Sequence, residues 1–389
     1  MKDTLQLDKG HFKNNIMKKI IGLTIITCFT TATSVLYSQA KQINPDTLVK
    51  RLGETFMKDK QAVGLSIGVY HNSTNYFYNF GTTEKGRVQP PTQNTVYEIG
   101  SVTKAFVSLI LANAVVEKKV KLDDDIRKYL EGTYPNLEYN KKPIKLVHLA
   151  NTTSGIPNWL PATPTEIINA SPDSSGYLRE KIYGSYKEND FFNALHGVVL
   201  DTVPGYKTRH SNAAAQLLTY ILEKVYNTSI ENLVTKYVLQ PNKMDNTTFL
   251  ASKTGSKNLS QGYDDKGNRM PYFTTAFMKG VGGLNSTTSD LLKFIKSQLD
   301  KKDKAGVLSQ QKTFNAGYYT IGLSWLTYKH DNGNHQVWTD GGTYGFVTYI
   351  VFYPEINSGV VVLANESDDT TPGKLGDIAY QIFDFMQKK

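Results

Sequence analysis

The sequence predicts an α/β (α+β) protein with two lobes, in which an antiparallel sheet flanked by helices lies beside an all-helical lobe. Three observations predict this class. Strand-like segments occur near both ends of the chain, helical periodicity dominates the residues between them, and the last segment is again helical. Strands from both ends pair most economically in one sheet, and the helical middle then forms an insertion beside that sheet.

The first elements expected along the chain are a helix and a pair of strands. Residues 46–58 have apolar side chains four residues apart, which is the spacing of one helical face. Residues 63–70 and 75–81 have the composition of strands, and a polar turn at residues 71–73 separates them. We therefore expect a β-hairpin after the first helix.

The middle of the chain, residues 101–300, carries mostly helical signals. Two stretches place apolar side chains three or four residues apart, and a third begins after capping residues. The side chains that carry these signals are Ala105, Leu109, Ala112 and Val116, then Ala214, Leu218, Ile221 and Val225, and finally Thr288-Ser289-Asp290 before Leu291, Phe294 and Leu299.

The C-terminal part returns to strand-like patterns after Gly317, with period two or continuous apolar runs. The expected strands are residues 319–328, 336–339, 345–353 and 359–364, with a turn at Asn332-Gly333 and a last helix over 374–388. We expect a single domain over residues 41–389. Its sheet lobe takes about residues 41–100 and 301–389, and its helical lobe takes about 101–300.

The composition is that of an ordinary globular protein. Of the 389 residues, 40% are hydrophobic and 20% are charged, which excludes a disordered or collagen-like chain. The one cysteine excludes an internal disulfide and a cysteine-rich zinc site. The formal charge of +9 is spread along the chain without a basic run, so we expect no nucleic acid as a partner.

The N-terminal residues 1–40 have the pattern of a signal peptide with a short extension before it. A basic start at Met17-Lys18-Lys19 precedes an apolar run, and Ser38-Gln39-Ala40 provides a small-residue junction. A transmembrane anchor is the alternative, but threonines interrupt the run. We expect a signal peptide over about residues 17–40, a periplasmic or secreted protein, and no stable membrane span after the signal is removed.

One short motif carries potential chemistry. Ser101 is placed at a predicted helix N-terminus, and Lys104 follows one turn later on the same face. The hydroxyl of a serine is a weak nucleophile and needs an adjacent base, which a lysine amine can supply. The alternative is an ordinary helix cap with a solvent-exposed lysine, since this spacing occurs by chance in many chains.

Other candidate motifs are weaker. Gly64-Leu65-Ser66-Ile67-Gly68 matches the letters of a nucleophile elbow, but Ser66 lies inside a strand-like run where that elbow needs a strand, a sharp turn and a helix. The seven histidines are scattered without the paired spacing of metal ligands. We therefore expect no metal and no cofactor.

The context of Ser101 resembles a known family. The successive blocks are YEIGSVTKAF, HLANTTSGIP, PGYKTRHSNAAAQLLTYILE, GVGGLNSTTSDLLKF, GLSW and WTDGGTYGF. In order and spacing they are similar to the serine β-lactamase-like and penicillin-binding-protein-like hydrolases, the class C β-lactamases and their peptidase and esterase relatives. The resemblance covers about residues 45–388 and implies the two-lobed fold of that family.

The resemblance also implies site residues. It makes Ser101 the acyl-forming nucleophile and Lys104 its partner. The second motif falls at His210-Ser211-Asn212, with Asn212 orienting the substrate or the lysine. The third falls at Thr339-Asp340-Gly341, and the backbone N–H groups of Gly342 and Ser101 are the implied oxyanion donors.

Two positions depart from the family pattern. His210 replaces the usual tyrosine, so it could be the general base, a bystander beside Lys104 as the base, or a sign of lost function. Thr339 replaces the usual lysine or histidine and cannot attract a substrate carboxylate. This argues against β-lactams and C-terminal D-Ala-D-Ala peptides, and Asp340 beside it would repel anions further if its side chain faces the cleft.

Together these features predict an exported serine hydrolase that acts through an acyl-enzyme on an ester or amide, of the D,D-peptidase/carboxypeptidase or esterase type. The alternatives are a true β-lactamase and a non-catalytic penicillin-binding-like pseudoenzyme. The expected partner is a small-molecule or peptide substrate, with cell-wall-derived compounds among the candidates.

Overall fold

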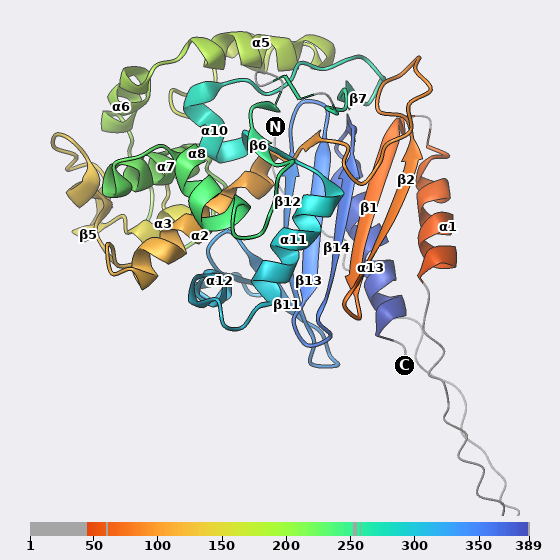
Figure 1. Cartoon of the computed structure of the whole chain (residues 1–389). Coiled ribbons are helices and arrows are strands. Elements are labelled where there is room, and N and C mark those ends of the chain that lie inside the picture. The colour runs from red at the N-terminus through yellow and green to blue at the C-terminus, as the bar shows by residue number, and fades with distance from the viewer. Residues whose placement is uncertain (1–44, 60, 252–254, 257, 388–389) are drawn as a thin grey trace, which may run out of the picture. The chain divides into compact units, whose positions relative to one another are not determined.

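A sheet of eight antiparallel strands crosses the molecule and takes strands from both ends of the chain (Figure 1). The computed structural model describes residues 45–387 except residues 60, 252–254 and 257, so the expected signal segment lies outside the described residues. The strand order is β2-β1-β14-β13-β12-β11-β10-β9. The strands are β1 Gly64–His71, β2 Thr74–Gly81, β9 Phe314–Asn315, β10 Thr320–Ile321, β11 Leu326–Lys329, β12 His335–Gly342, β13 Val347–Tyr353 and β14 Ser358–Ala364.

Short strands form three smaller sheets. Their pairings are β3-β8-β6, β15-β7 and β4-β5. Their bounds are β3 Tyr97–Glu98, β4 Glu138–Tyr139, β5 Lys142–Pro143, β6 Thr248–Phe249, β7 Tyr263–Asp264, β8 Leu284–Ser286 and β15 Glu366–Ser367. The pair β3-β8 joins the segment that leads to Ser101 to the segment that leads into the helix after β8.

The described helices cover both faces of the large sheet and form the helical region beside it (Figure 1). They are α1 Asp46–Phe56, α2 Thr103–Val116, α3 Leu146–Ala150, α4 Thr165–Ile168, α5 Pro172–Ser185, α6 Glu188–His196, α7 Asn212–Tyr226, α8 Ile230–Val234, α10 Lys279–Gly282, α11 Thr288–Leu299, α12 Lys304–Gln310 and α13 Thr371–Met386. Helices α1 and α13 pack on one face, and α11 packs on the other against β1 and β14. The predicted α/β class with a helical middle is confirmed.

Strand β13 shows why the sheet is buried on both faces. All seven of its residues are buried. Val351 and Tyr353 belong to the core under α1 and α13, while Ile350 and Phe352 belong to the core under α2 and α11. Successive side chains of a strand point to opposite faces, so a continuous apolar run is what a sheet covered by helices on both sides requires.

Three details differ from the sequence-based expectations. Residues 319–328 form two short strands, β10 and β11, because Gly322 to Trp325 turn the chain and Ser324 has a φ of 61°. The cap of α11 is Thr287, whose side chain accepts a hydrogen bond from the Asp290 N–H. Lys279–Gly282 form the short helix α10, which is not among the elements expected from the sequence.

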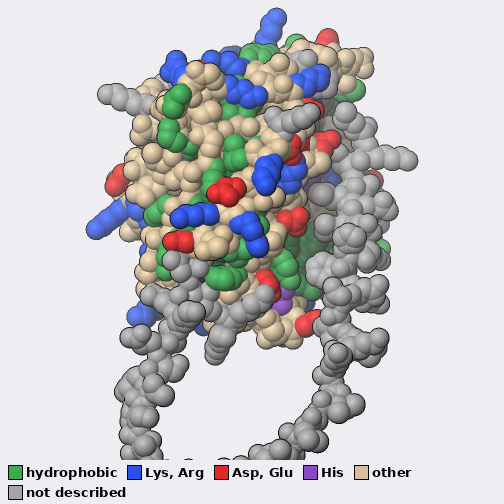
Figure 2. Space-filling model, turned by 90° about the vertical axis from the view of Figure 1, so that its right-hand side faces the viewer, with side chains coloured by type: hydrophobic (Ala, Val, Ile, Leu, Met, Phe, Trp, Pro, Cys, Tyr) green, Lys and Arg blue, Asp and Glu red, His purple; other side chains and the backbone are tan. Residues whose placement is uncertain are grey.

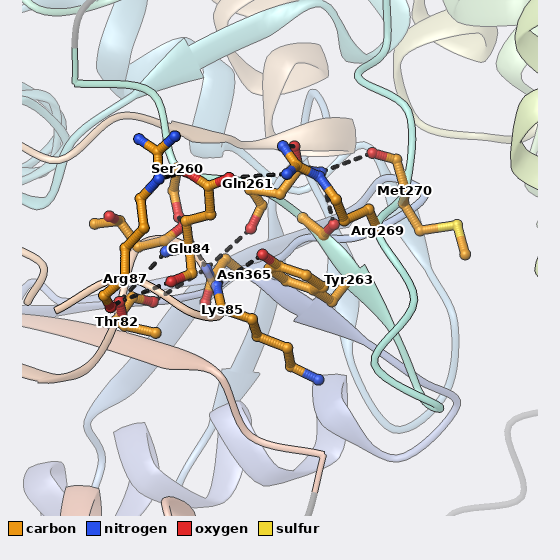
Figure 3. Close-up of polar contacts among 12 residues, drawn as sticks. Thr82, Glu84, Lys85, Arg87, Ser260, Gln261, Tyr263, Arg269, Met270 and Asn365 are labelled. Atoms are coloured by element: carbon orange, nitrogen blue, oxygen red, sulfur yellow. Dashed lines mark hydrogen bonds and ion pairs between the residues drawn. The ribbon is translucent and has the colours of Figure 1, made fainter. Parts of the chain in front are cut away.

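A buried polar network joins three distant segments at the end of the sheet (Figure 3). Asn365, which is 0% exposed, donates from Nδ2 to the main-chain oxygen of Gln261 at 2.9 Å and to Ser260 Oγ at 2.9 Å. The same nitrogen lies 3.3 Å from the Thr82 oxygen and 3.2 Å from the Thr83 oxygen. This one amide therefore satisfies buried acceptors from two loops that no strand pairing connects.

We expect the substitution Asn365→Leu to lower the free energy of unfolding by about 2–3 kcal/mol, because it leaves buried carbonyl groups without a donor. Urea unfolding of the mature protein measures this change. Asn193→Leu, on the exposed side of α6, is the matched control, and we expect it to change the same quantity by less than about 0.5 kcal/mol. Equal stability of the two variants would contradict the role of the network.

The surface drawn in Figure 2 carries lysine and arginine side chains interspersed with aspartate and glutamate. Neither sign forms a continuous patch on this face. Among the described residues, no helix combines the length and the apolar character that crossing a membrane requires.

Candidate active site

Ser101 lies in a short three-ten turn, η1 Gly100–Val102, which leads directly into α2. The sequence placed it at a helix start, and the structure puts it one step before the α-helix itself. Lys104, in the first turn of α2, points back so that its Nζ lies 2.6 Å from Ser101 Oγ. The Thr103 hydroxyl accepts a hydrogen bond from the Leu284 N–H at 3.2 Å and fixes this helix start to β8.

The environment of Lys104 favours the neutral amine. Ten of the fourteen residues of α2 are buried, so the first turn of the helix, with Lys104, lies in the protein interior. Burial lowers the pKa of Lys104 from 10.5 to about 7, and the Asp340 carboxylate partly opposes this shift. The protonated amine loses its hydration when it is buried, and this loss destabilises it by more than the attraction of the Asp340 carboxylate stabilises it. At neutral pH a large share of Lys104 is therefore a free base beside the Ser101 hydroxyl.

Glycines bring the end of β12 against the backbone of Ser101. A side chain at Gly341 would meet the Ile99 oxygen at 2.3 Å and the Ser101 nitrogen at 2.7 Å. Gly100 has a φ of +49°, and a Cβ there would lie 2.8 Å from the Gly342 nitrogen. Only glycine allows these approaches. They place the backbone of Gly342 next to that of Ser101, which is the arrangement that a pair of oxyanion donors needs.

The end of β12 has a free edge. Strand β11 pairs with residues 335–338 of β12, whereas residues 339–342 pair with β13 alone among the described strands. Thr339 lies on this stretch and is only 9% exposed. Its side chain is uncharged, so the position that the resemblance associates with a cation contributes no positive charge here.

Asp340 lies on the opposite face of β12 from Thr339. It is directly opposite Tyr349 of β13, and residues directly opposite in a ladder share one face of the sheet. Desolvation raises the pKa of the Asp340 carboxyl, while Lys104 lowers it. Burial alternates along the end of β12: Thr339 and Gly341 are buried, whereas Asp340 and Gly342 are exposed to solvent.

His210 and Asn212 meet at a shared acceptor. The Asn212 N–H donates to Asn158 Oδ1 at 3.1 Å, and His210 Nδ1 lies 3.1 Å from the same oxygen. Because a backbone N–H can only donate, this oxygen is an acceptor, so Nδ1 of His210 carries the proton. In the neutral ring the lone pair is then on Nε2. Asn158 was not singled out from the sequence, because no local pattern marks its contact with residues more than fifty positions away.

Lys104 and His210 line one small cavity. Its volume is about 20 Å³, and Ser108, Ser211 and Ser324 contribute hydroxyl groups or backbone to the same wall. A cavity of this size has room for one water molecule. Val107, Leu149 and Leu218 also line it, so much of its wall is apolar. The structure therefore brings the two candidate bases to one small cavity, although they are more than a hundred residues apart in sequence.

Two carboxylates accept hydrogen bonds from the backbone of residues 273–274. Glu98 is 1% exposed and accepts a hydrogen bond from the Phe273 N–H at 2.7 Å. Burial raises the pKa of Glu98 to about 7. Glu180 of α5 accepts from the Thr274 N–H at 2.8 Å, and the Tyr344 hydroxyl lies 3.4 Å from its other oxygen. The sequence analysis missed both, because each joins segments that only the fold brings together.

Ser66 is a strand residue, as expected. It lies within β1, is 0% exposed, and its hydroxyl lies 2.9 Å from the Tyr97 hydroxyl. A nucleophile must be reachable by its substrate, and Ser66 is enclosed in the core. Ser101 is therefore the better candidate on structural grounds as well.

Comparison with known proteins gives a family for the chain. A family model described as Beta-lactamase matches residues 49–382. A β-lactamase of Yersinia enterocolitica is 26% identical over 395 residues, covering 90% of this chain and 95% of that protein. Protein flp of Staphylococcus aureus (strain MRSA252) is 29% identical over 340 residues, covering 82% of this chain and 62% of that protein.

Solved structures show the same fold. A class C β-lactamase superimposes with a TM-score of 0.75 at 22% identity, covering 89% of this chain and 97% of that one. A β-lactamase/D-alanine carboxypeptidase from Yersinia pestis, complexed with citrate, gives a TM-score of 0.73 at 24% identity over 89% of this chain and 100% of that one. The match to the family spans most of the chain and the fold agrees with it, so this chain belongs to the β-lactamase family of serine hydrolases.

Proposed function

We propose that this hydrolase forms an acyl-enzyme at Ser101 with an ester or amide substrate, of the D,D-peptidase/carboxypeptidase or esterase type. One observation carries the proposal: Lys104 Nζ lies 2.6 Å from Ser101 Oγ, and the pKa of that amine is lowered to about 7. A nucleophile next to a base that is free at neutral pH is the arrangement required for acyl transfer.

Acylation follows from this geometry. The neutral Lys104 amine takes the Ser101 proton while Oγ attacks the substrate carbonyl, whose oxygen becomes negative. The N–H groups of Ser101 and Gly342 stabilise that oxyanion. The C–O or C–N bond then breaks, and the Lys104 ammonium returns the proton to the leaving group.

Deacylation repeats the same proton path with water. The Lys104 amine takes a proton from a water molecule as its oxygen attacks the acyl carbonyl. The ester bond to Ser101 breaks, the acid leaves, and Oγ recovers its proton from the lysine. The carboxamide of Asn212, at the start of α7, would orient the substrate amide or the lysine.

His210 takes a supporting role in this proposal. Its Nδ1 donates to Asn158 Oδ1, so the lone pair of the neutral ring is on Nε2. It lines the same small cavity as Lys104, which has room for one water molecule. We assign the first proton transfer to Lys104, because Lys104 contacts Ser101 Oγ directly.

A true β-lactamase is the second candidate. The names of the similar proteins from Yersinia favour it. The uncharged Thr339 disfavours it, since β-lactams carry a carboxylate that this residue cannot attract. Turnover of nitrocefin well above the background rate would place this candidate first.

Covalent labelling tests the proposed function. An alkyl fluorophosphonate should add to the mature protein in one equivalent, and peptide mapping should locate the adduct on Ser101. A pseudoenzyme predicts no adduct. Labelling at another serine, or none under conditions that label a control serine hydrolase, would overturn the proposal.

We also propose that the protein is exported to the periplasm or secreted. The basic start, apolar run and small-residue junction over residues 17–40 support this. N-terminal sequencing of the protein recovered outside the cytoplasm tests it, with a mature N-terminus near residue 41 expected. An uncleaved N-terminus would contradict the proposal.

A further inference from the structure

Asp340 is a charged side chain beside the proposed site that the acyl-transfer steps do not use. It lies on the stretch of β12 that pairs with β13 alone, one residue after Thr339 and two before Gly342. Its side chain is on the exposed face of the strand end. A substrate whose carbonyl reaches the Gly342 N–H therefore passes within one or two strand residues of this carboxylate.

The carboxylate of Asp340 lies in the electrostatic field of one buried amine. In the described part of the chain no lysine or arginine pairs with it, and Lys104 is the cation that acts on it electrostatically. Lys104 itself is only partly protonated near neutral pH, because burial lowers its pKa to about 7. The negative charge is thus available to a group on the substrate.

No positive charge from the neighbouring residues described here outweighs the negative charge of Asp340. Thr339 carries no charge, and Glu180 accepts a hydrogen bond from the Thr274 N–H and lies within 3.4 Å of the Tyr344 hydroxyl. Arg179 acts on Tyr344 from α5. Arg179 is not among the charges that act on Asp340, whereas Lys104 is. A substrate along the free edge first meets a carboxylate.

We propose that Asp340 is a specificity-determining residue that selects acyl donors carrying a cationic group near the reacting carbonyl and disfavours those carrying a carboxylate or sulfonate. This inference rests on the proposed function, because it concerns the substrate of the same site. It identifies the substrate class as amine- or ammonium-bearing esters or amides.

Three 4-nitrophenyl esters with one leaving group test the inference. The acyl groups are 4-(trimethylammonio)butanoate, its uncharged isostere 5,5-dimethylhexanoate, and 4-sulfobutanoate. Their permanent charges do not titrate, so pH changes only the enzyme. We expect the wild-type kcat/KM to follow the order cationic, neutral, anionic.

The variants isolate the carboxylate. In Asp340→Asn, and likewise in Asp340→Thr, we expect the ratio of kcat/KM for the cationic ester over the neutral ester to fall about tenfold, and the ratio for the anionic ester over the neutral one to rise. Asp331→Asn, in the turn before β12 at the strand's other end, is the matched control and should leave both ratios unchanged.

The outcomes separate the two proposals. Hydrolysis of the neutral ester with a flat charge series, or with ratios that Asp340→Asn does not move, overturns the inference about Asp340 and leaves the proposed function standing. A wild-type preference for the sulfonate ester overturns it as well. No hydrolysis of any ester together with no labelling of Ser101 overturns the proposed function, and this inference with it.

Discussion

Ser101→Ala is expected to lower kcat/KM for a small chromogenic ester by about 10⁴–10⁶-fold, because the acyl-enzyme can no longer form. What remains is the contribution of the backbone donors and of substrate binding. Steady-state hydrolysis of the mature protein measures the loss. The fold should be intact, since the change removes a single oxygen from a half-buried side chain.

Ser185→Ala is the matched control for this prediction. Ser185 ends α5 and is exposed, so the same atomic change there should leave kcat/KM unaltered. Full activity of Ser101→Ala would show that Ser101 is not the nucleophile. Residual activity that the fluorophosphonate still inhibits would point to a second nucleophilic serine.

Lys104→Met is expected to lower kcat/KM by about 10²–10⁴-fold, because the hydroxyl loses its general base. In the wild type we expect kcat/KM to rise with pH through about 7, since the Lys104 pKa is near 7 and only the neutral amine accepts a proton. Lys104→Arg should be inactive up to pH 9, because a guanidinium stays protonated. The pH–rate profiles of the three proteins measure this.

The profile also separates Lys104 from His210. If Lys104→Met keeps high activity that still rises through a pKa between 6 and 7, His210 is the base and the assignment to Lys104 is wrong. His210→Phe is the complementary variant. We expect it to keep the ascending limb near pH 7, because the amine that contacts Ser101 Oγ is still present.

Lys104 also has a consequence for stability. Its pKa is about 7 in the folded protein and 10.5 as its ordinary value, so between these pH values the unfolded chain binds more protons. Stability should therefore rise as the pH increases from 7 to about 10.5. Lys104→Met removes this contribution, so the variant should show a higher Tm at pH 7 while losing activity.

Much of the fold was predictable because its signals are local. The pairs β1-β2 and β13-β14 follow from strand-like runs with turns between them, and α7 follows from its apolar spacing. The division of residues 319–328 into β10 and β11 was not predictable in the same way. It depends on a left-handed conformation at Ser324, and serine does not mark such a position in a sequence.

The candidate site was likewise predictable where its contacts are local in sequence, and not where they join distant segments. Ser101 and Lys104 are three residues apart on one turn, so their contact follows from helical geometry alone. The contact of Asn158 with His210, and that of Glu98 with Phe273, join segments about 50 and 175 positions apart. The side that Asp340 faces depends on the register of β12 with β13, and a one-residue shift would reverse it.

The unpaired end of β12 has a further consequence, for the behaviour of the protein at high concentration. An exposed row of backbone donors and acceptors is a template on which another chain can add a strand, and such edges promote aggregation. Asp340 places a charge on this edge, and two glycines follow it within four residues. Charge and low strand propensity are ways in which natural sheets discourage edge-to-edge pairing. Residues 339–342, which leave an edge open for a substrate, therefore also disfavour edge-to-edge aggregation with other copies of the protein.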